Sequence, residues 1–155
     1  MAQNDVNALC DMHEKWLVKH QDGKRAKFNG LVLRNLDLSN RNLSGAEFIG
    51  ADCRNANFSN SNISGCNFYR AKLDRADLSV SWAEGVLGNG KEISTAQLGG
   101  KTVIVFPNFI QFGCVKEDYS IFDKPDEYII TLDDDDKAIV WWATWKETVR
   151  SLVNV

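Results

Sequence analysis

A period of five residues governs residues 26–80. Written in fives from Ala26, this segment gives eleven repeats, and the third position of every repeat is apolar. These third positions are Phe28, Leu33, Leu38, Leu43, Phe48, Cys53, Phe58, Ile63, Phe68, Leu73 and Leu78. An amphipathic helix repeats every 3.6 residues and a strand every two, so a sustained period of five fits neither. The chain must instead turn a corner once in each repeat.

Most repeats begin with a small residue, and many continue with Asp or Asn. The motif is clearest in 51–55, 56–60 and 76–80. It resembles the pentapeptide-repeat family. The resemblance implies a right-handed quadrilateral β-helix, a solenoid with four repeats in each coil, so that residues four repeats apart stack on one another.

An internal comparison of the sequence agrees with coils of this kind. Residues 34–53 align with 54–73 without gaps, and identical residues recur at a spacing of 20. The identical pairs include Arg34/Arg54, Asn35/Asn55, Ser39/Ser59, Asn40/Asn60, Asn42/Asn62, Ser44/Ser64, Gly45/Gly65 and Phe48/Phe68. We therefore expect Phe28, Phe48 and Phe68 to form one interior column and Phe58 to lie in another. Eleven repeats correspond to about 2.75 coils, a column only about 13 Å tall.

So short a solenoid has two open ends with unpaired backbone groups, and the flanking segments can cover them. Residues 4–20 carry apolar and His side chains at helical spacing, which predicts an amphipathic helix over the first coil, with Gly23 suited to its stop. The inward side chains of this helix would be Val6, Leu9, His13, Trp16, Leu17 and His20.

The last 75 residues predict a mixed segment. Thr102–Phe106 and Phe109–Phe112 are typical of two short strands around a turn. Residues 125–132 fit either a helix that begins at Pro125 or a strand. The final segment predicts a helix whose apolar face closes the last coil or pairs two subunits as a homodimer. That face comprises Ala138, Trp142, Trp145, Val149 and Leu152.

The predicted fold is therefore mainly β. A capping helix lies within 1–25, the solenoid spans 26–80, and an α+β segment that ends in a helix spans 81–155. We expect these parts to form one compact unit.

The sequence offers little for catalysis. Its only histidines are His13 and His20, and nucleophile motifs, dinucleotide-binding glycine turns and P-loops are missing. Cys10 and His13 have the spacing of half a zinc site, but no second pair of ligands follows. Asp133–Asp136 lacks the spacing of a calcium loop. We therefore expect no enzyme, no cofactor and no bound metal.

Cysteine usage and hydropathy favour a soluble, cytoplasmic protein that does not enter a membrane. The four cysteines are scattered, without a CxxC pair or the dense spacing of a disulfide framework. They are Cys10, Cys53, Cys66 and Cys114. No apolar run is long enough to cross a bilayer, and the N-terminus lacks the basic and apolar regions of a signal peptide.

The net charge of −3 is unevenly distributed and predicts two candidate binding surfaces. The repeats carry seven bases against five acids, whereas residues 81–155 carry twelve acids against seven bases. The first surface, the basic face, lies on the second face of the solenoid and comprises Arg34, Arg54, Tyr69, Arg70, Lys72 and Arg75. The second, the acidic tail, comprises Glu117, Asp118, Asp123, Asp126, Glu127, Asp133, Asp134, Asp135 and Asp136. The other faces present mainly Ser and Asn and could also bind a partner.

These features favour a non-catalytic interaction module that binds a protein partner through solenoid faces or the acidic tail. The family resemblance implies an alternative, a DNA mimic that inhibits an enzyme such as gyrase, although this solenoid is short and carries more bases than acids. A direct nucleic-acid binder is a further alternative, which the negative net charge disfavours. Residues after the repeats, including Ile110–Cys114, resemble the tails of phage and prophage members, which implies a bacterial or phage origin.

Overall fold

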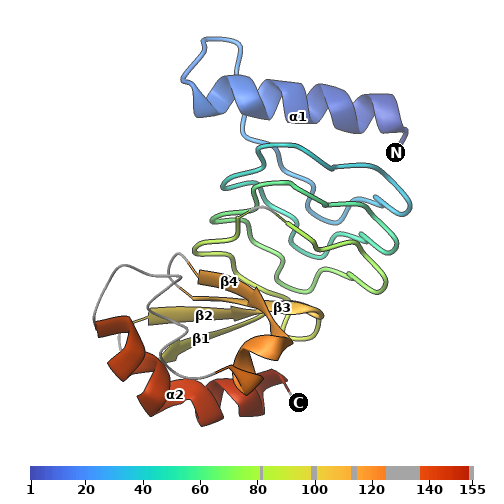
Figure 1. The fold of residues 1–155 in the computed structure, drawn as a ribbon. Coiled ribbons are helices and arrows are strands. Elements are labelled where there is room, and N and C mark those ends of the chain that lie inside the picture. The colour runs from blue at the N-terminus through green and yellow to red at the C-terminus, as the bar shows by residue number, and fades with distance from the viewer. Residues whose placement is uncertain (81, 99–100, 113–114, 125–136, 154–155) are drawn as a thin grey trace. The chain divides into compact units, whose positions relative to one another are not determined.

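The chain forms two compact units, Met1–Ser94 and Thr95–Val155. The computed structural model describes residues 1–80, 82–98, 101–112, 115–124 and 137–153. The first unit contains helix α1 (Gln3–Leu17) and the solenoid, and the second contains a four-stranded sheet, a 3-10 turn and helix α2 (Lys137–Val153) (Figure 1). Strand β1 begins at the division between the units.

The solenoid is held together by a ladder of parallel backbone bridges between residues 20 apart. At most bridges two hydrogen bonds connect neighbouring coils. The Phe28 N–H donates to the Glu47 carbonyl at 2.7 Å, and the Glu47 N–H donates to the Ala26 carbonyl at 3.1 Å. Because every bridged pair is separated by four repeats, the stacking interval predicted from the internal identities is confirmed.

The ladder runs beyond Val80, where the five-residue pattern fades in the sequence. Bridges join Asn62 to Trp82 and Asn67 to Leu87. The inward third positions of these two repeats hold Ala83, which is fully buried, and Gly88. A Cβ atom at Gly88 would lie 1.9 Å from the Ile93 carbonyl oxygen, so only glycine fits this close approach. Because these third positions hold small residues, the pattern of large apolar third positions does not predict the last two repeats.

The Asp or Asn at the second position of a repeat stabilises the turn that follows. The Asn57 side-chain oxygen accepts a hydrogen bond from the Ser59 N–H at 2.9 Å, and Asp77 accepts one from the Ser79 N–H at 3.0 Å. The same bond recurs in the repeats that contain Asp37, Asn42, Asn62 and Asn67. These Asx turns explain why the motif favours Asp and Asn at this position.

Except at Val80, the corners of the solenoid place the fifth residue of the repeat in the left-handed region of backbone space. Glycine and asparagine occupy most corners, because they tolerate positive φ. Two corners depart from this rule: Arg70 and Arg75 both have φ of 58°. The corners stacked with Arg70 are Gly30, Gly50 and Gly90, and those stacked with Arg75 are Asn35 and Asn55. The two arginines therefore occupy backbone positions that other residues fit better.

Stacked aromatic rings fill one side of the solenoid interior. Phe48 lies between Phe28 and Phe68, with ring centroids 4.8 and 4.7 Å away and nearly parallel planes. Phe58 belongs to another column, as predicted. Its ring nevertheless makes edge contacts with Phe48 at 5.5 Å and Phe68 at 5.7 Å, so columns from different faces meet in the interior.

We predict that Phe48→Ala lowers the free energy of unfolding by about 3–5 kcal/mol, because the fully buried ring leaves a cavity. A double-mutant cycle of Phe48→Leu with Phe68→Leu should give a coupling of about 0.5–1.5 kcal/mol, measured by urea denaturation. Phe28 with Phe68 is the control pair, since Phe48 separates the two rings. Additive effects of Phe48 and Phe68 would contradict the stacked column.

Helix α1 supplies side chains that replace the missing backbone partners of the first coil. In lower coils, the second residue of a repeat donates its N–H to the coil before it. The Asp37 N–H has no such coil and donates to Gln3 Oε1 at 2.8 Å, while Gln3 Nε2 donates to the Asp37 carbonyl at 2.7 Å. The Asn42 N–H likewise donates to Glu14 Oε1 at 3.2 Å. The predicted capping role of this helix is therefore confirmed for the first unit.

The inward face of α1 is narrower than predicted. Val6, Cys10 and His13 are buried, whereas Trp16 is 39% exposed and His20 lies outside the helix. The helix ends at Leu17 because Lys19 takes a φ of 57° and the Lys19 N–H turns back to the Trp16 carbonyl. The prediction that the helix continues to His20 was therefore wrong for the residues after Leu17.

His13 is fully buried, and both of its ring nitrogens have partners. Nδ1 accepts a hydrogen bond from the Ala26 N–H at 3.1 Å, so the ring must carry its proton on Nε2. Nε2 then donates to the Ser44 carbonyl at 3.1 Å. In lower coils such a carbonyl accepts from a backbone N–H, as Ser64 does from Gly45. Burial lowers the pKa of His13, and the Ala26 N–H requires the neutral ring.

This arrangement predicts that stability falls with acidification. The unfolded chain takes up a proton on His13 as the pH drops below about 6.5, whereas the folded protein resists protonation because its pKa is lower. The stabilisation is therefore present above that pH and is lost as the pH decreases through the window beneath it. Urea denaturation at about pH 7.5 and about pH 5.5 should show a smaller pH effect in His13→Gln than in the unaltered protein. His20→Gln is the control, and an equal pH effect in all three proteins would contradict the role of His13.

The second unit contains an antiparallel sheet of four strands in the order β1-β2-β3-β4. The strands are β1 (Ser94–Leu98), β2 (Lys101–Val105), β3 (Phe109–Phe112) and β4 (Val115–Asp118), followed by the 3-10 turn η1 (Tyr119–Asp123). Val103 pairs with Phe112, and Phe112 pairs with Val115. The two strands predicted around Pro107 are therefore confirmed as β2 and β3, whereas β1 and β4 were not predicted.

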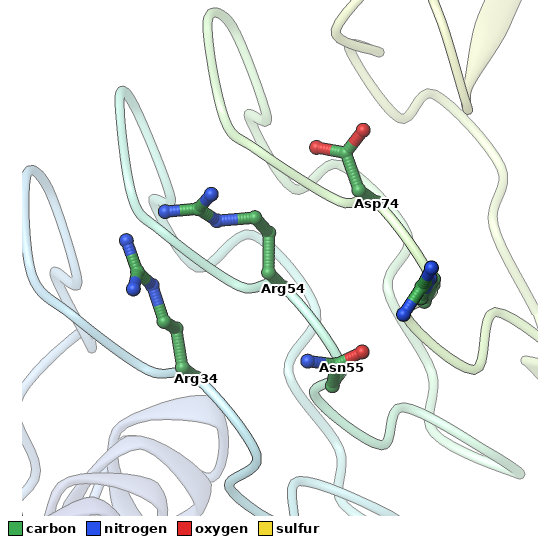
Figure 2. A pocket seen from close by; sticks show the side chains of 5 residues that line it. Arg34, Arg54, Asn55 and Asp74 are labelled. Carbon is green, nitrogen blue, oxygen red and sulfur yellow. The ribbon is translucent and has the colours of Figure 1, made fainter.

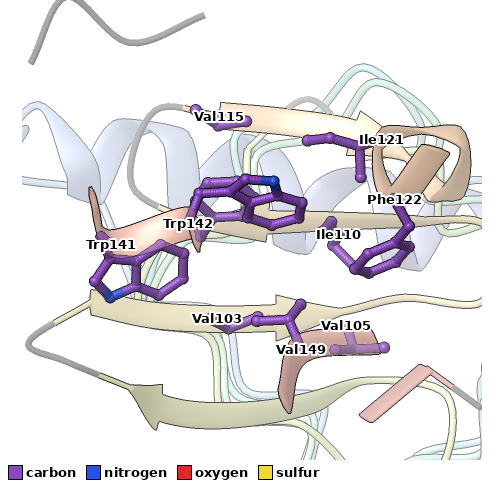
Figure 3. Packing of buried hydrophobic residues seen from close by; sticks show 10 residues of the cluster. Val103, Val105, Ile110, Val115, Ile121, Phe122, Trp141, Trp142 and Val149 are labelled. Carbon is purple, nitrogen blue, oxygen red and sulfur yellow. The ribbon is translucent and has the colours of Figure 1, made fainter. Parts of the chain in front are cut away.

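Helix α2 buries apolar side chains in the core of its own unit. Trp141, Trp142 and Val149 belong to this core (Figure 3), and Trp142 and Val149 are fully buried. The Trp141 ring stacks on Phe112 with centroids 5.2 Å apart. The Trp141 indole also donates to the Leu98 carbonyl at 2.8 Å. The predicted helix is confirmed, and Trp142 and Val149 pack in the core of its own unit. Closure of the last coil by this helix stays a prediction. Leu152 is 39% exposed, and pairing of subunits through α2 stays a prediction.

Candidate binding site on the solenoid

An open pocket of about 450 Å³ lies at a corner of the solenoid. Its lining residues are Arg34, Arg54, Asn55, Asp74 and Arg75 (Figure 2). The side chains come from three stacked coils because Arg34, Arg54 and Asp74 share the fourth position of repeats that follow one another at intervals of 20 residues. Asn55 and Arg75 occupy the adjoining corners. The ladder thus brings together residues that are far apart in the sequence.

A single carboxylate, that of Asp52, orients two of the guanidinium groups. Arg34 Nε and Nη2 contact Asp52 Oδ2 at 2.7 and 2.6 Å. Arg54 Nε and Nη2 contact the two Asp52 oxygens at 2.9 and 2.8 Å. Asp52 is only 9% exposed, so these pairs are partly shielded from solvent. Each guanidinium uses the same edge for Asp52 and keeps its remaining N–H groups for other partners.

The remaining two charged residues of the pocket differ in their partners. Asp74 accepts a hydrogen bond from Lys91, which lowers the pKa of this carboxyl, and Lys91 also pairs with Glu92 at 2.8 Å. Arg75 makes no ion pair or side-chain hydrogen bond with any other residue that the structure describes. Arg75 therefore presents all of its N–H donors to an incoming group.

Comparison with known proteins identifies the repeats. A family model for pentapeptide repeats matches residues 24–52 and 42–79, with eight copies. The solenoid is a run of pentapeptide repeats. No curated protein matches the chain. A pentapeptide repeat protein, Rfr23 from the cyanobacterium Cyanothece 51142, matches with 23% identity and a TM-score of 0.39. The match covers 41% of this chain and 44% of that protein, so this chain spans less than half of the relative's length.

The predicted basic face of the pentapeptide repeats divides into two groups. Arg34, Arg54 and Arg75 line the pocket, whereas Tyr69, Arg70 and Lys72 do not. The Arg70 guanidinium lies 5.1 Å from the centre of the exposed Tyr69 ring. Lys72 is bridged through its backbone to Asp52. Sequence reasoning missed Asn55 as a lining residue, although its place beneath Asn35 in the corner column could have indicated it.

The contacts of Arg54 make it a poor position for a charge reversal that is meant to leave folding intact. Arg54 is not a free surface cation, because both of its inner nitrogens bind the nearly buried Asp52. A glutamate at position 54 would place a second carboxylate beside Asp52. It would also remove one of the two guanidiniums that neutralise the Asp52 charge. Reversals that test binding are better placed at Arg75, which holds no other described residue in position.

Three residues of the acidic tail lie within the described part of the chain. Asp118 caps the η1 turn by accepting a hydrogen bond from the Ser120 N–H at 2.8 Å. Asp123 lies 3.9 Å from Arg150, and burial raises the pKa of Glu117. The segment 125–132, whose conformation the sequence left open, lies outside the described residues. The remaining acids of the tail also lie outside them, namely Asp126, Glu127, Asp133, Asp134, Asp135 and Asp136.

The cysteines of the described residues are structural. Burial raises the pKa of the Cys10 thiol to about 11 and those of Cys53 and Cys66 to about 12, so these thiols stay protonated at neutral pH. His13 uses both ring nitrogens within the cap. No cluster of three or more His, Cys, Asp or Glu with the geometry of a metal site occurs in the described part of the chain. Among the same residues, no helix combines the length and apolarity that a membrane crossing requires.

We predict that Asp52→Asn lowers the free energy of unfolding by about 1–3 kcal/mol, because an amide cannot compensate two guanidiniums. Asp74→Asn should cost less than Asp52→Asn, since this carboxylate is exposed and its ion pair is screened by solvent. Urea denaturation of both variants measures the difference. Equal losses in the two variants would contradict the anchoring role of Asp52.

Proposed function

We propose that this protein is a non-catalytic interaction module that binds a protein partner through the pocket of its pentapeptide repeats. The observation that carries the proposal is the fixed pair of guanidiniums on Asp52, next to the uncommitted Arg75. A partner meets donors whose orientation is already set by the ladder and by ion pairs, so little side-chain entropy is lost on binding. A complementary acidic surface is the partner chemistry that this arrangement favours.

The chemistry of the described residues supports binding rather than catalysis. The buried thiols and the doubly hydrogen-bonded His13 have structural roles. The pocket itself contains guanidiniums, an amide and one carboxylate that is engaged by Lys91. None of these groups combines a nucleophile with an adjacent base. We also propose a cytoplasmic location, which suits the free cysteines Cys10, Cys53 and Cys66.

Charge at the pocket favours a protein over DNA as partner, and it does not favour DNA mimicry. A DNA mimic needs an extended acidic surface, but the outward side chains of this pocket are mostly basic. Asp52 and Asp74 in turn interrupt the basic surface, which weakens attraction to a continuous polyanion. A single acidic group on a protein suits this mixture of arginine and aspartate side chains better than a continuous polyanion does.

We predict that Lys72→Glu with Arg75→Glu prevents capture of the partner from a lysate of the native host. Both side chains lie outside the Asp52 ion pairs, so the variant should fold, and its added negative charge repels an acidic partner. Lys15→Glu with Lys24→Glu is the matched control, because it changes the net charge equally at exposed positions near α1. Lys72 lies outside the pocket lining, so Arg75→Glu alone should already weaken capture. Capture that survives in the Lys72→Glu, Arg75→Glu variant, or is lost equally in the control, would contradict the proposed site.

A further inference from the structure

The corner column that contains Arg75 holds an arginine where the backbone conformation suits asparagine better. The two corners stacked above it are Asn35 and Asn55, with φ of 60° and 57°, and Asn tolerates this conformation better than Arg does. Arg75 adopts a φ of 58° in the same column. Backbone strain that no local contact of the side chain offsets points to a functional role of the residue. Here the strained residue lines the pocket and binds no other described side chain.

The donors around the pocket suit an oxyanion with several acceptor oxygens. Arg34 and Arg54 extend side by side from neighbouring coils (Figure 2), with their inner edges fixed on Asp52. Arg75 lines the same pocket. Asn55 adds an amide to the lining. A planar carboxylate satisfies one guanidinium fork, whereas a phosphate monoester has three terminal oxygens that can accept from three forks.

The carboxylates of the site limit the kind of anion that it accepts. Three guanidiniums exceed Asp52 and Asp74 by one positive charge. Lys91 and Glu92, which are paired with each other, add no further net charge. This small excess attracts a single compact anion, but Asp74 at the pocket repels the neighbouring charges of a polymer. A phosphodiester chain is therefore a poorer ligand than one terminal phosphate group.

We propose that this pocket binds a phosphate monoester, carried by the protein partner as a phosphorylated side chain. The inference rests on the proposed function, since it specifies the chemical group that the interaction module recognises. Arg34 and Arg54 provide preset donors, and Arg75 adds a third guanidinium to the lining of the same pocket. The backbone conformation of Arg75 lowers the stability of the free protein. This loss is offset only when the Arg75 guanidinium binds the anion.

The test compares two matched substitutions, Arg75→Asn and Arg70→Asn. Each replaces an arginine with positive φ by a residue that fits the corner, so both variants should melt at or above the temperature of the unaltered protein. Calorimetric titration with inorganic phosphate and with phosphoserine should show binding to the unaltered protein and to Arg70→Asn. Arg75→Asn should weaken binding by about tenfold or more. Equal affinity of the two variants, or no binding to the unaltered protein, would overturn the proposal.

Two further titrations distinguish other anions, and one capture experiment separates this proposal from the broader function. Succinate or a short DNA duplex that binds as tightly as phosphoserine, and depends on Arg75, would overturn the preference for a phosphate monoester. Phosphatase treatment of the host lysate should prevent capture of the partner. If capture survives this treatment but is still lost in the Lys72→Glu, Arg75→Glu variant, the interaction module stands and the phosphate proposal fails.

Discussion

The hydrogen bonds between coils are the constraint on which the first unit depends. Because each bridge joins residues 20 apart, every side chain has a fixed neighbour in the coils above and below it. Phenylalanines thereby meet face to face, and Asp52 comes to lie beside arginines from two different repeats. The same ladder produces a dry core and a charged pocket. Packing and candidate binding site are thus two results of one backbone register.

The sequence predicts this register well because each repeat contains several independent signals that agree. The apolar third position gives the direction of the side chain, the Asp or Asn gives the turn, and Gly or Asn gives the corner. Prediction fails where one signal is replaced by a special contact. Gly88 lacks an apolar side chain because the Ile93 carbonyl occupies its space, so the repeat is invisible although the ladder continues.

The candidate site was predicted less completely for a physical reason. The period indicates which side chains point outward, and it placed Arg34, Arg54 and Arg75 on the solenoid surface. Ion pairs, however, depend on how long side chains bend across coils, which the period does not encode. The nearly buried position of Asp52 and the cation–π contact of Arg70 with Tyr69 are contacts of this kind. The structure therefore divided a face that the sequence treated as uniform.

Gln3 gives the cap a consequence for assembly. Its side-chain amide donates to and accepts from the backbone of Asp37, as a peptide group of a preceding coil would do. Without α1, the first coil would offer the same donors and acceptors to the edge of another molecule. Solenoids could then stack end to end. Because nothing in the repeat itself limits the number of coils, such stacking would lead to fibre growth. The amide of one glutamine therefore helps to make the solenoid finite at this end.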